Sequence, residues 1–530
     1  MEENAVNASA WEQAASYLGD NLVSYMLASE SVPKAEALSA EQMTAARTIL
    51  AALADSDLNE WDPHRRMDDL ARKFCAYIPK LRDSLATALH FACGGRRPEM
   101  NSTDPLEQLL IELALDAYPA FLIGSAQGAS AGLPSVVWNH PARAEAEEAI
   151  FQSGEPLMKL FPQADFGEAP APGSGRDWQL RSQFLWSDGS VQTLQLIQIP
   201  ITILNKSNGA LEHGKSGLEA YVGSVRSTLT TARALAGGEP AQVPVLAGCY
   251  SAALAQDDVQ LRLSQGRFRG KTKMDSALVA GSETVVFEMP TELSLLKRYD
   301  EESWPILTED QRASAKKFTE DLHEGISRAR MAVLLASKDR EVLAVGQSFL
   351  TVVNPLASGH SYTNSPLAWP LAQFQSRPLT TNDEKSIQEW DALLGLMPKG
   401  LRTGRDRLLA AVSERYSPHD GFIDAVITWE NLFGAAGETG LRVCGSIARL
   451  LHPANAESRT SLYKKTKAMY DKRSKLVHGG NVQLTTEEAA LLRDDAVHIA
   501  IQAWRLVLGT ESLRSVNDSA VRSNLVLLGA

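Results

Sequence analysis

Apolar residues recur at three- and four-residue spacing along most of the chain, a pattern that predicts amphipathic helices. Residues 1–120 show this spacing in three segments, and the chain from about 381 to its end shows it almost without interruption. Between 176 and 360, short runs rich in β-branched and aromatic residues accompany two helical patterns. The pattern therefore predicts an α+β fold that is mainly α.

Changes in composition divide the 530 residues into three parts, in line with about 100–200 residues per domain. A Pro/Gly/Ser-rich segment at 165–176 and a polar, proline-containing segment after 357 interrupt the regular patterns. We expect a helical N-terminal region at 1–164, a mixed α/β central domain at 165–370 and an all-α bundle at 371–530. In the central part, Asp188-Gly189 lies between two β-rich runs and predicts a hairpin.

The C-terminal region divides into about six helices with recognisable start and stop signals. Ser417-Pro418 opens a helix that should end at Gly434, and Thr485 opens a later one. Between them, a basic helix should end at Gly479. No repeat of 20–50 residues is present, which argues against a solenoid.

The composition is that of an ordinary globular protein, with 44% apolar and 22% charged residues. No apolar run approaches the roughly 18–20 residues that span a bilayer, and the first residues do not resemble a secretory leader. The four cysteines are scattered and form no zinc-type pair. We therefore expect a cytoplasmic protein that has no membrane contact, no metal site and no cofactor.

A net charge of −12 argues at first against a nucleic-acid binder, but the charge is unevenly distributed. Residues 401–530 carry 17 basic and 14 acidic side chains, and the other 400 residues carry a net −15. Seven basic residues against one acidic residue lie between Arg459 and Lys475. A basic helix of this kind suits phosphate contact, although a solvated helix face has the same composition.

The basic helix ends in YDKRSKLVHGG, in which Arg473 is followed five residues later by His478. This segment resembles the HEPN superfamily, and within it the Apea-like HEPN proteins, whose fingerprint is Arg, four to six residues and then His near a helix end. The earlier segment TWENLFG has Glu430 where these families have an acidic partner. The likeness covers about 381–510. It departs from the family at Ser474, where active members often have Asn, Asp or His.

The resemblance implies a metal-independent endoribonuclease, with a bacterial setting such as abortive infection against phage. In it, His478 would be a general base or acid, Arg473 would stabilise the phosphorane, and Glu430 would orient Arg473. Ser474 and the basic run would position the RNA; the lysines concerned are Lys464, Lys465, Lys467, Lys472 and Lys475. The N-terminal domains would sense an unknown trigger.

Helix geometry adds a constraint of its own to this picture. Five residues turn through about 500°, so Arg473 and His478 lie about 140° apart on one helix. Two copies related by a two-fold axis could bring both groups to one groove, which predicts a homodimer or a higher homo-oligomer. Histidine titrates near neutral pH, and arginine binds phosphate oxygens in pairs. Acidic N-terminal domains could also cover the basic helix and restrain it.

Two other interpretations remain open at the level of sequence. The bundle could be a non-catalytic scaffold for dimerisation or RNA binding, because the bare spacing is common: Arg493 and His498 repeat it in a mid-helix setting that favours a buried or half-buried structural histidine. Alternatively, a segment after ITIL matches the P-loop pattern for nucleotide binding. Its residues would be Gly209, Gly214, Lys215 and Ser216.

Overall fold

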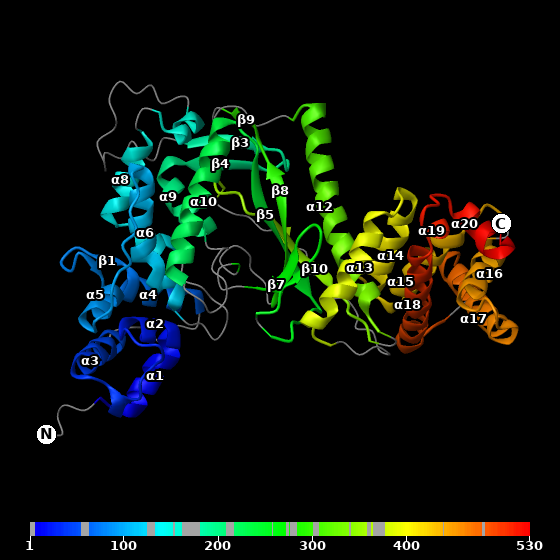
Figure 1. The fold of residues 1–530 in the computed structure, drawn as a ribbon, viewed down its shortest axis with the longest axis horizontal. Helices are drawn as coiled ribbons and strands as arrows, with labels where there is room; N and C mark the ends of the chain where they lie inside the picture. The colour runs from blue at the N-terminus through cyan, green and yellow to red at the C-terminus, as the bar shows by residue number, and fades with distance from the viewer. Residues whose placement is uncertain are drawn as a thin grey trace.

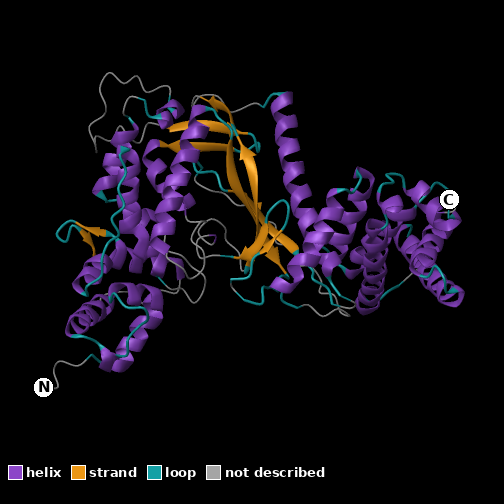
Figure 2. Ribbon diagram, viewed as in Figure 1, coloured by secondary structure: helices purple, strands orange, loops and turns teal. Residues whose placement is uncertain are grey.

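The computed structural model has its N-terminal helices at one end, β-sheets in the middle and a helical bundle at the other end (Figure 1). Helices predominate over strands, which confirms the predicted α+β, mainly α class (Figure 2). The residues that the structure describes are 6–54, 63–123, 133–151, 154–161, 181–207, 217–256, 258–271, 275, 283–299, 307–338, 341–357, 362–363, 377–437, 439–479 and 483–529.

The N-terminal part is helical, as predicted, but its helices are shorter than the pattern suggests. Gly19, with a φ of 83°, separates the first two helices. A small hairpin, Tyr77–Ile78 (β1) and Asp83–Ser84 (β2), interrupts the third of the three helical segments that the sequence predicts within residues 1–120, because Pro79 removes a helix-forming N–H. The helices are Ala8–Leu18 (α1), Asp20–Met26 (α2), Ala40–Ala54 (α3), Pro63–Cys75 (α4), Leu85–Ala92 (α5), Pro105–Leu122 (α6), Leu133–Val137 (α7) and Pro141–Ile150 (α8).

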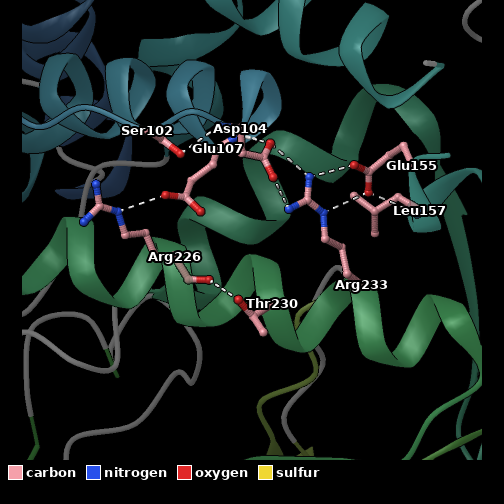
Figure 3. A network of polar contacts seen from close by, with 8 residues as sticks. All are labelled: Ser102, Asp104, Glu107, Glu155, Leu157, Arg226, Thr230 and Arg233. Atoms are coloured by element: carbon pink, nitrogen blue, oxygen red, sulfur yellow. Dashed lines mark hydrogen bonds and ion pairs between the residues drawn. The ribbon is translucent and has the colours of Figure 1, made fainter. Parts of the chain in front are cut away.

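A long helix, Gly217–Gly237 (α10), packs against α6 and is held there by arginine side chains (Figure 3). Arg233 donates two hydrogen bonds to Asp104, at 2.6 and 3.1 Å, and two to Glu155, at 2.7 and 3.0 Å. Asp104 also caps the N-terminus of α6, since it accepts a hydrogen bond from the Glu107 N–H. Arg233 therefore joins α10 to the start of α6 and to the short helix Pro156–Leu160.

The predicted hairpin at Asp188-Gly189 is confirmed. Strands Arg181–Trp186 (β3) and Val191–Gln195 (β4) pair antiparallel, and Gly189 has a φ of 81° in the turn. The sequence predicts that the β-rich run continues beyond β4, but this prediction is wrong. The chain instead forms the short helix Leu196–Gln198 and then the helix Ile199–Ser207 (α9). The segment before the P-loop match is thus a helix, whereas a P-loop follows a strand. Gly209, Gly214, Lys215 and Ser216 themselves lie outside the described residues.

The central sheet has the strand order β11-β10-β5-β8-β7-β6, and its neighbouring strands are antiparallel. Its two longest strands pair from Ala241–Leu293 at one end to Cys249–Val285 at the other. A second sheet has the order β4-β3-β9. The remaining strands are Ala241–Tyr250 (β5), Leu261–Arg262 (β6), Arg267–Gly270 (β7), Val285–Leu293 (β8), Leu295–Tyr299 (β9), Gly346–Val352 (β10) and Tyr362–Thr363 (β11).

Two large hydrophobic cores hold the molecule together. The first contains the N-terminal helices with α9, α10 and the Val243 end of β5. The second joins the other half of the central sheet to the helix Glu309–Ala336 (α12) and to the C-terminal bundle. These cores extend across the expected domain boundaries at 164/165 and 370/371, so the three-domain division stays a prediction.

The C-terminal bundle follows the predicted start and stop signals closely. Ser417 and Thr485 cap their helices, and Gly479 takes a φ of 71° after the basic helix. Trp429 is buried and donates through Nε1 to the Ala496 carbonyl at 3.2 Å, which locks two helices together. The bundle consists of Glu384–Gly395 (α13), Arg402–Ser413 (α14), Pro418–Phe433 (α15), Thr439–Leu451 (α16), Ala456–Val477 (α17), Thr486–Gly509 (α18), Glu511–Arg514 (α19) and Ser519–Leu528 (α20).

The basic helix α17 lies at the end of the molecule opposite the helices α1–α8 (Figure 1). Contrary to the expectation from the sequence, the described helices of the acidic N-terminal part do not cover α17 within a single chain. The physical reason is the docking of the bundle on α12, through ion pairs such as Arg405–Glu324 at 2.7 Å and Arg330–Glu414 at 2.8 Å. Within the described residues, no helix combines the length and apolar character needed to cross a membrane.

Candidate functional site

Two bundle helices bring Arg473 and Glu430 together across 43 residues of sequence. Glu430 lies in the last turn of α15, and Arg473 lies in the last turns of α17, which packs against α15. The guanidinium group spans the carboxylate, with Nη2 3.0 Å from Oε2 and Nη1 3.3 Å from Oε1. The Arg473 side chain is 14% exposed. This pairing is the one that the sequence predicts for Glu430.

The carboxylate of Glu430 has a second partner residue that the sequence did not indicate. Tyr470, one turn before Arg473 on α17, donates its hydroxyl hydrogen to Glu430 Oε1 at 2.7 Å. Burial and the neighbouring carboxylate raise the pKa of the Tyr470 phenol, so the hydroxyl stays protonated as a donor. The spacing of three residues from Arg473 puts both side chains toward the same neighbouring helix, and this is the only signal that the sequence carried for the contact.

His478 ends the same helix but faces away from this cluster. Its backbone N–H donates to the Ser474 carbonyl at 3.0 Å, so the helical turn continues to this residue, and its side chain is exposed. Arg473 is mostly buried toward α15, as expected from the angle of about 140° between the two positions. One copy therefore does not bring Arg473 and His478 to a common point. Ser474 is half-buried between them.

The five predicted RNA-binding lysines do not share one environment. Lys465 pairs with Asp495 at 2.9 Å, and Lys467 pairs with Asp471 on its own helix. Three other lysines are exposed and have no ion pair with a described residue; these are Lys464, Lys472 and Lys475. By helix geometry, Lys464 and Lys475 lie within about 60° of His478. The positive charges of Lys464 and Lys475 thus lie on the same side of the helix as His478, not on the side of Arg473.

The second Arg-x4-His match is structural, as its mid-helix setting predicts. Arg493 is fully buried in α18 and pairs with Asp494 at 2.9 Å. Burial lowers the pKa of Arg493, since a charged group is less stable away from water. His498 is half-buried, and its Nε2 lies 3.0 Å from Gln502 Nε2. This pair has no exposed histidine at a helix end.

Comparison with known proteins gives no relative in which the same site could be examined. No protein-family model matches the chain, and neither a curated protein nor a solved structure does. Among the described residues, no group of three or more His, Cys, Asp or Glu side chains is arranged to hold a metal ion.

Proposed function

We propose that the C-terminal bundle is an RNA-cleaving domain of HEPN type and that the chain is a metal-independent endoribonuclease. The observation that supports this most strongly is the Glu430–Arg473 pair, formed between two residues that the resemblance assigns to one site. An exposed histidine at the end of α17 and exposed lysines on the same helix add the groups that RNA cleavage requires.

The site needs two copies of the chain, because Arg473 and His478 point about 140° apart. If two bundles meet across a two-fold axis, the ends of both α17 helices line one groove. The groove then contains two arginines and two histidines. We therefore propose a homodimer or a higher homo-oligomer as the active form.

The chemistry follows from the groups present. His478 of one copy removes the proton of an RNA 2′-hydroxyl, and O2′ attacks the adjacent phosphorus. Arg473 stabilises the negative charge on the phosphorane oxygens. The P–O5′ bond then breaks, and His478 of the second copy protonates O5′. The products are a 2′,3′-cyclic phosphate and a 5′-hydroxyl, and DNA is excluded as a substrate because it has no 2′-hydroxyl.

The remaining residues would act by position and charge. Glu430 orients Arg473, and the exposed lysines with Ser474 guide the RNA backbone toward the groove. In this proposal the protein works in the cytoplasm, and its larger N-terminal part responds to a trigger that releases activity, as in abortive infection. Since the described helices α1–α8 lie at the other end of the chain from α17, restraint would act on how two copies assemble.

A second candidate is a non-catalytic scaffold for dimerisation or RNA binding. It is favoured by one observation: both terminal nitrogens of Arg473 are already engaged by Glu430, which leaves the group less available to a phosphate. Cleavage of RNA in EDTA by the full chain, lost in Arg473→Ala and His478→Ala, separates the two. Binding without cleavage would support the scaffold.

A further inference from the structure

Three hydrogen bonds converge on the Glu430 carboxylate, and the shortest of them comes from Tyr470. Its hydroxyl lies 2.7 Å from Oε1, whereas Arg473 Nη1 lies 3.3 Å from the same oxygen. Arg473 meets the other oxygen, Oε2, at 3.0 Å. The carboxylate is thus held at one oxygen mainly by the tyrosine and at the other by the arginine.

We infer that Tyr470 is a positioning residue, which fixes the rotation of the Glu430 carboxylate and through it the plane of the Arg473 guanidinium. This inference rests on the proposed function, because it concerns the orientation of the arginine in the site. Tyr470 does not touch the reacting atoms in this account. It acts through Glu430.

Arg473 depends on this arrangement because it has few other contacts. Its Nε is buried and has no hydrogen-bond partner among the residues that the structure describes. Among the described residues, Glu430 is the acidic group that pairs with its guanidinium. If the carboxylate rotated about its own axis, the guanidinium would have to turn with it to keep both hydrogen bonds, because a bidentate contact requires the two planes to be aligned.

The surroundings place the tyrosine ring as firmly as its hydroxyl. Gly440, in the first turn of α16, lies against the ring: a Cβ at this position would be 3.2 Å from two ring carbons. On the carboxylate side, the Glu430 carbonyl accepts the Gly434 N–H at 2.6 Å, which fixes the end of α15. Backbone and ring are both held, so removal of the hydroxyl alone changes little except the carboxylate.

Tyr470→Phe in the full chain tests the inference, with Tyr463→Phe as the matched control. Tyr463 lies two turns earlier on α17, is half-buried, and its hydroxyl donates no hydrogen bond to a described residue. We expect Tyr470→Phe to lower kcat for RNA cleavage at least tenfold and to leave KM within about twofold, whereas Tyr463→Phe should behave as wild type. Unchanged kcat in Tyr470→Phe, or an effect on KM alone, would overturn the inference.

A second measurement does not depend on activity. In the ¹H–¹⁵N spectrum of the arginine side chains, the Nε–H signal of Arg473, assigned with Arg473→Lys, should shift in Tyr470→Phe and in Glu430→Gln but not in Tyr463→Phe. A signal that stays in place in Tyr470→Phe would refute the positioning role even if the wild type cleaves RNA. If the wild type does not cleave RNA, the proposed function fails, and this spectrum alone decides whether Tyr470 orients Arg473. Glu430→Gln probes the same contact should Tyr470→Phe fail to fold.

Discussion

Two arginine side chains in this protein show that a guanidinium group contributes paired hydrogen bonds to the structure in addition to its charge. Arg233 makes four hydrogen bonds to two carboxylates from two different parts of the chain, and Arg473 makes two to one carboxylate. The planar guanidinium allows such paired contacts, which an ammonium cannot form. The first arginine holds the N-terminal core together. The second, in our proposal, is oriented for contact with a phosphate group of the RNA.

Arg233→Lys should therefore destabilise the protein although it keeps the charge. A lysine can satisfy one of the two carboxylates at a time, so we expect a loss of about 1–2 kcal/mol in the free energy of unfolding of the N-terminal core. Urea unfolding followed by circular dichroism measures this. Arg226→Lys is the control, because Arg226 lies on the same helix and pairs with Glu107 of α6 while its side chain is 42% exposed. It should cost less than about 1 kcal/mol. Equal losses in both variants would contradict the argument.

Asp383 predicts a dependence of stability on pH. The hydrogen bonds from Arg377 lower its pKa from 3.8 to about 2, and it also accepts from the Thr380 N–H before α13. A carboxylate with a lowered pKa contributes stability above its unfolded pKa, and this contribution is lost as pH falls toward the folded value. Asp383→Asn should thus be less stable than wild type at pH 5–7, by about 1–2 kcal/mol.

The difference in the free energy of unfolding between the wild type and Asp383→Asn should disappear as pH falls from about 4 to about 2. Thermal unfolding of both proteins at several pH values measures this difference in stability. A difference that is independent of pH over this range would show that the Arg377–Asp383 pair is not its source.

Among the helices and strands, those with clear end signals could be predicted from sequence, and those decided by tertiary packing could not. Ser417, Thr485 and Gly479 mark helix ends by local hydrogen bonds and backbone angles, which is why the bundle follows the prediction. Residues 199–207 are rich in β-branched side chains but form α9, which is buried almost throughout. A fully buried apolar segment has no periodicity that distinguishes a helix from a strand.

The candidate site shows the same division. The pairing of Glu430 with Arg473 could be expected from the resemblance, and the angle between Arg473 and His478 from helix geometry. The Tyr470 contact could not, because it depends on the close approach of α15 and α17 and on the space left by Gly440. Nor could the pairing of Lys465 with Asp495, which lies on another helix.

The packing of α15 against α18 predicts an unusual effect of an alanine in a helix. Gly421 lies on α15, and a Cβ there would come within 2.7 Å of Cδ of the buried Arg493. Gly421→Ala should lower the free energy of unfolding by about 1–3 kcal/mol, because overpacking outweighs the gain in helix propensity. At the exposed Gly223 of α10, no atom of a described residue lies within 4 Å of such a Cβ, so Gly223→Ala should stabilise the protein by up to about 1 kcal/mol. Chemical denaturation would contradict this account if Gly421→Ala were stabilising.

The whole molecule separates its charges along its length. The basic helix α17 lies at one end and the helices α1–α8 at the other, with the sheet and α12 between them (Figure 1). The second core joins the bundle to α12 and to half of the sheet, so a change in the central part can reach the bundle through α12 and α18, where Arg505 donates to the Leu335 carbonyl at 3.0 Å. Control of the proposed nuclease would thus pass through packed helices rather than through a cover over α17.

Incubation of the full-length protein with total RNA in the presence of EDTA tests the central claim most directly. We predict that the wild type cleaves the RNA and that Arg473→Ala and His478→Ala each reduce the rate at least about 100-fold, since one removes a transition-state charge and the other the proton-transfer group. His323→Ala, an exposed histidine on α12, should cleave as the wild type does. Intact RNA with the wild type, or undiminished cleavage by both variants, would contradict the claim.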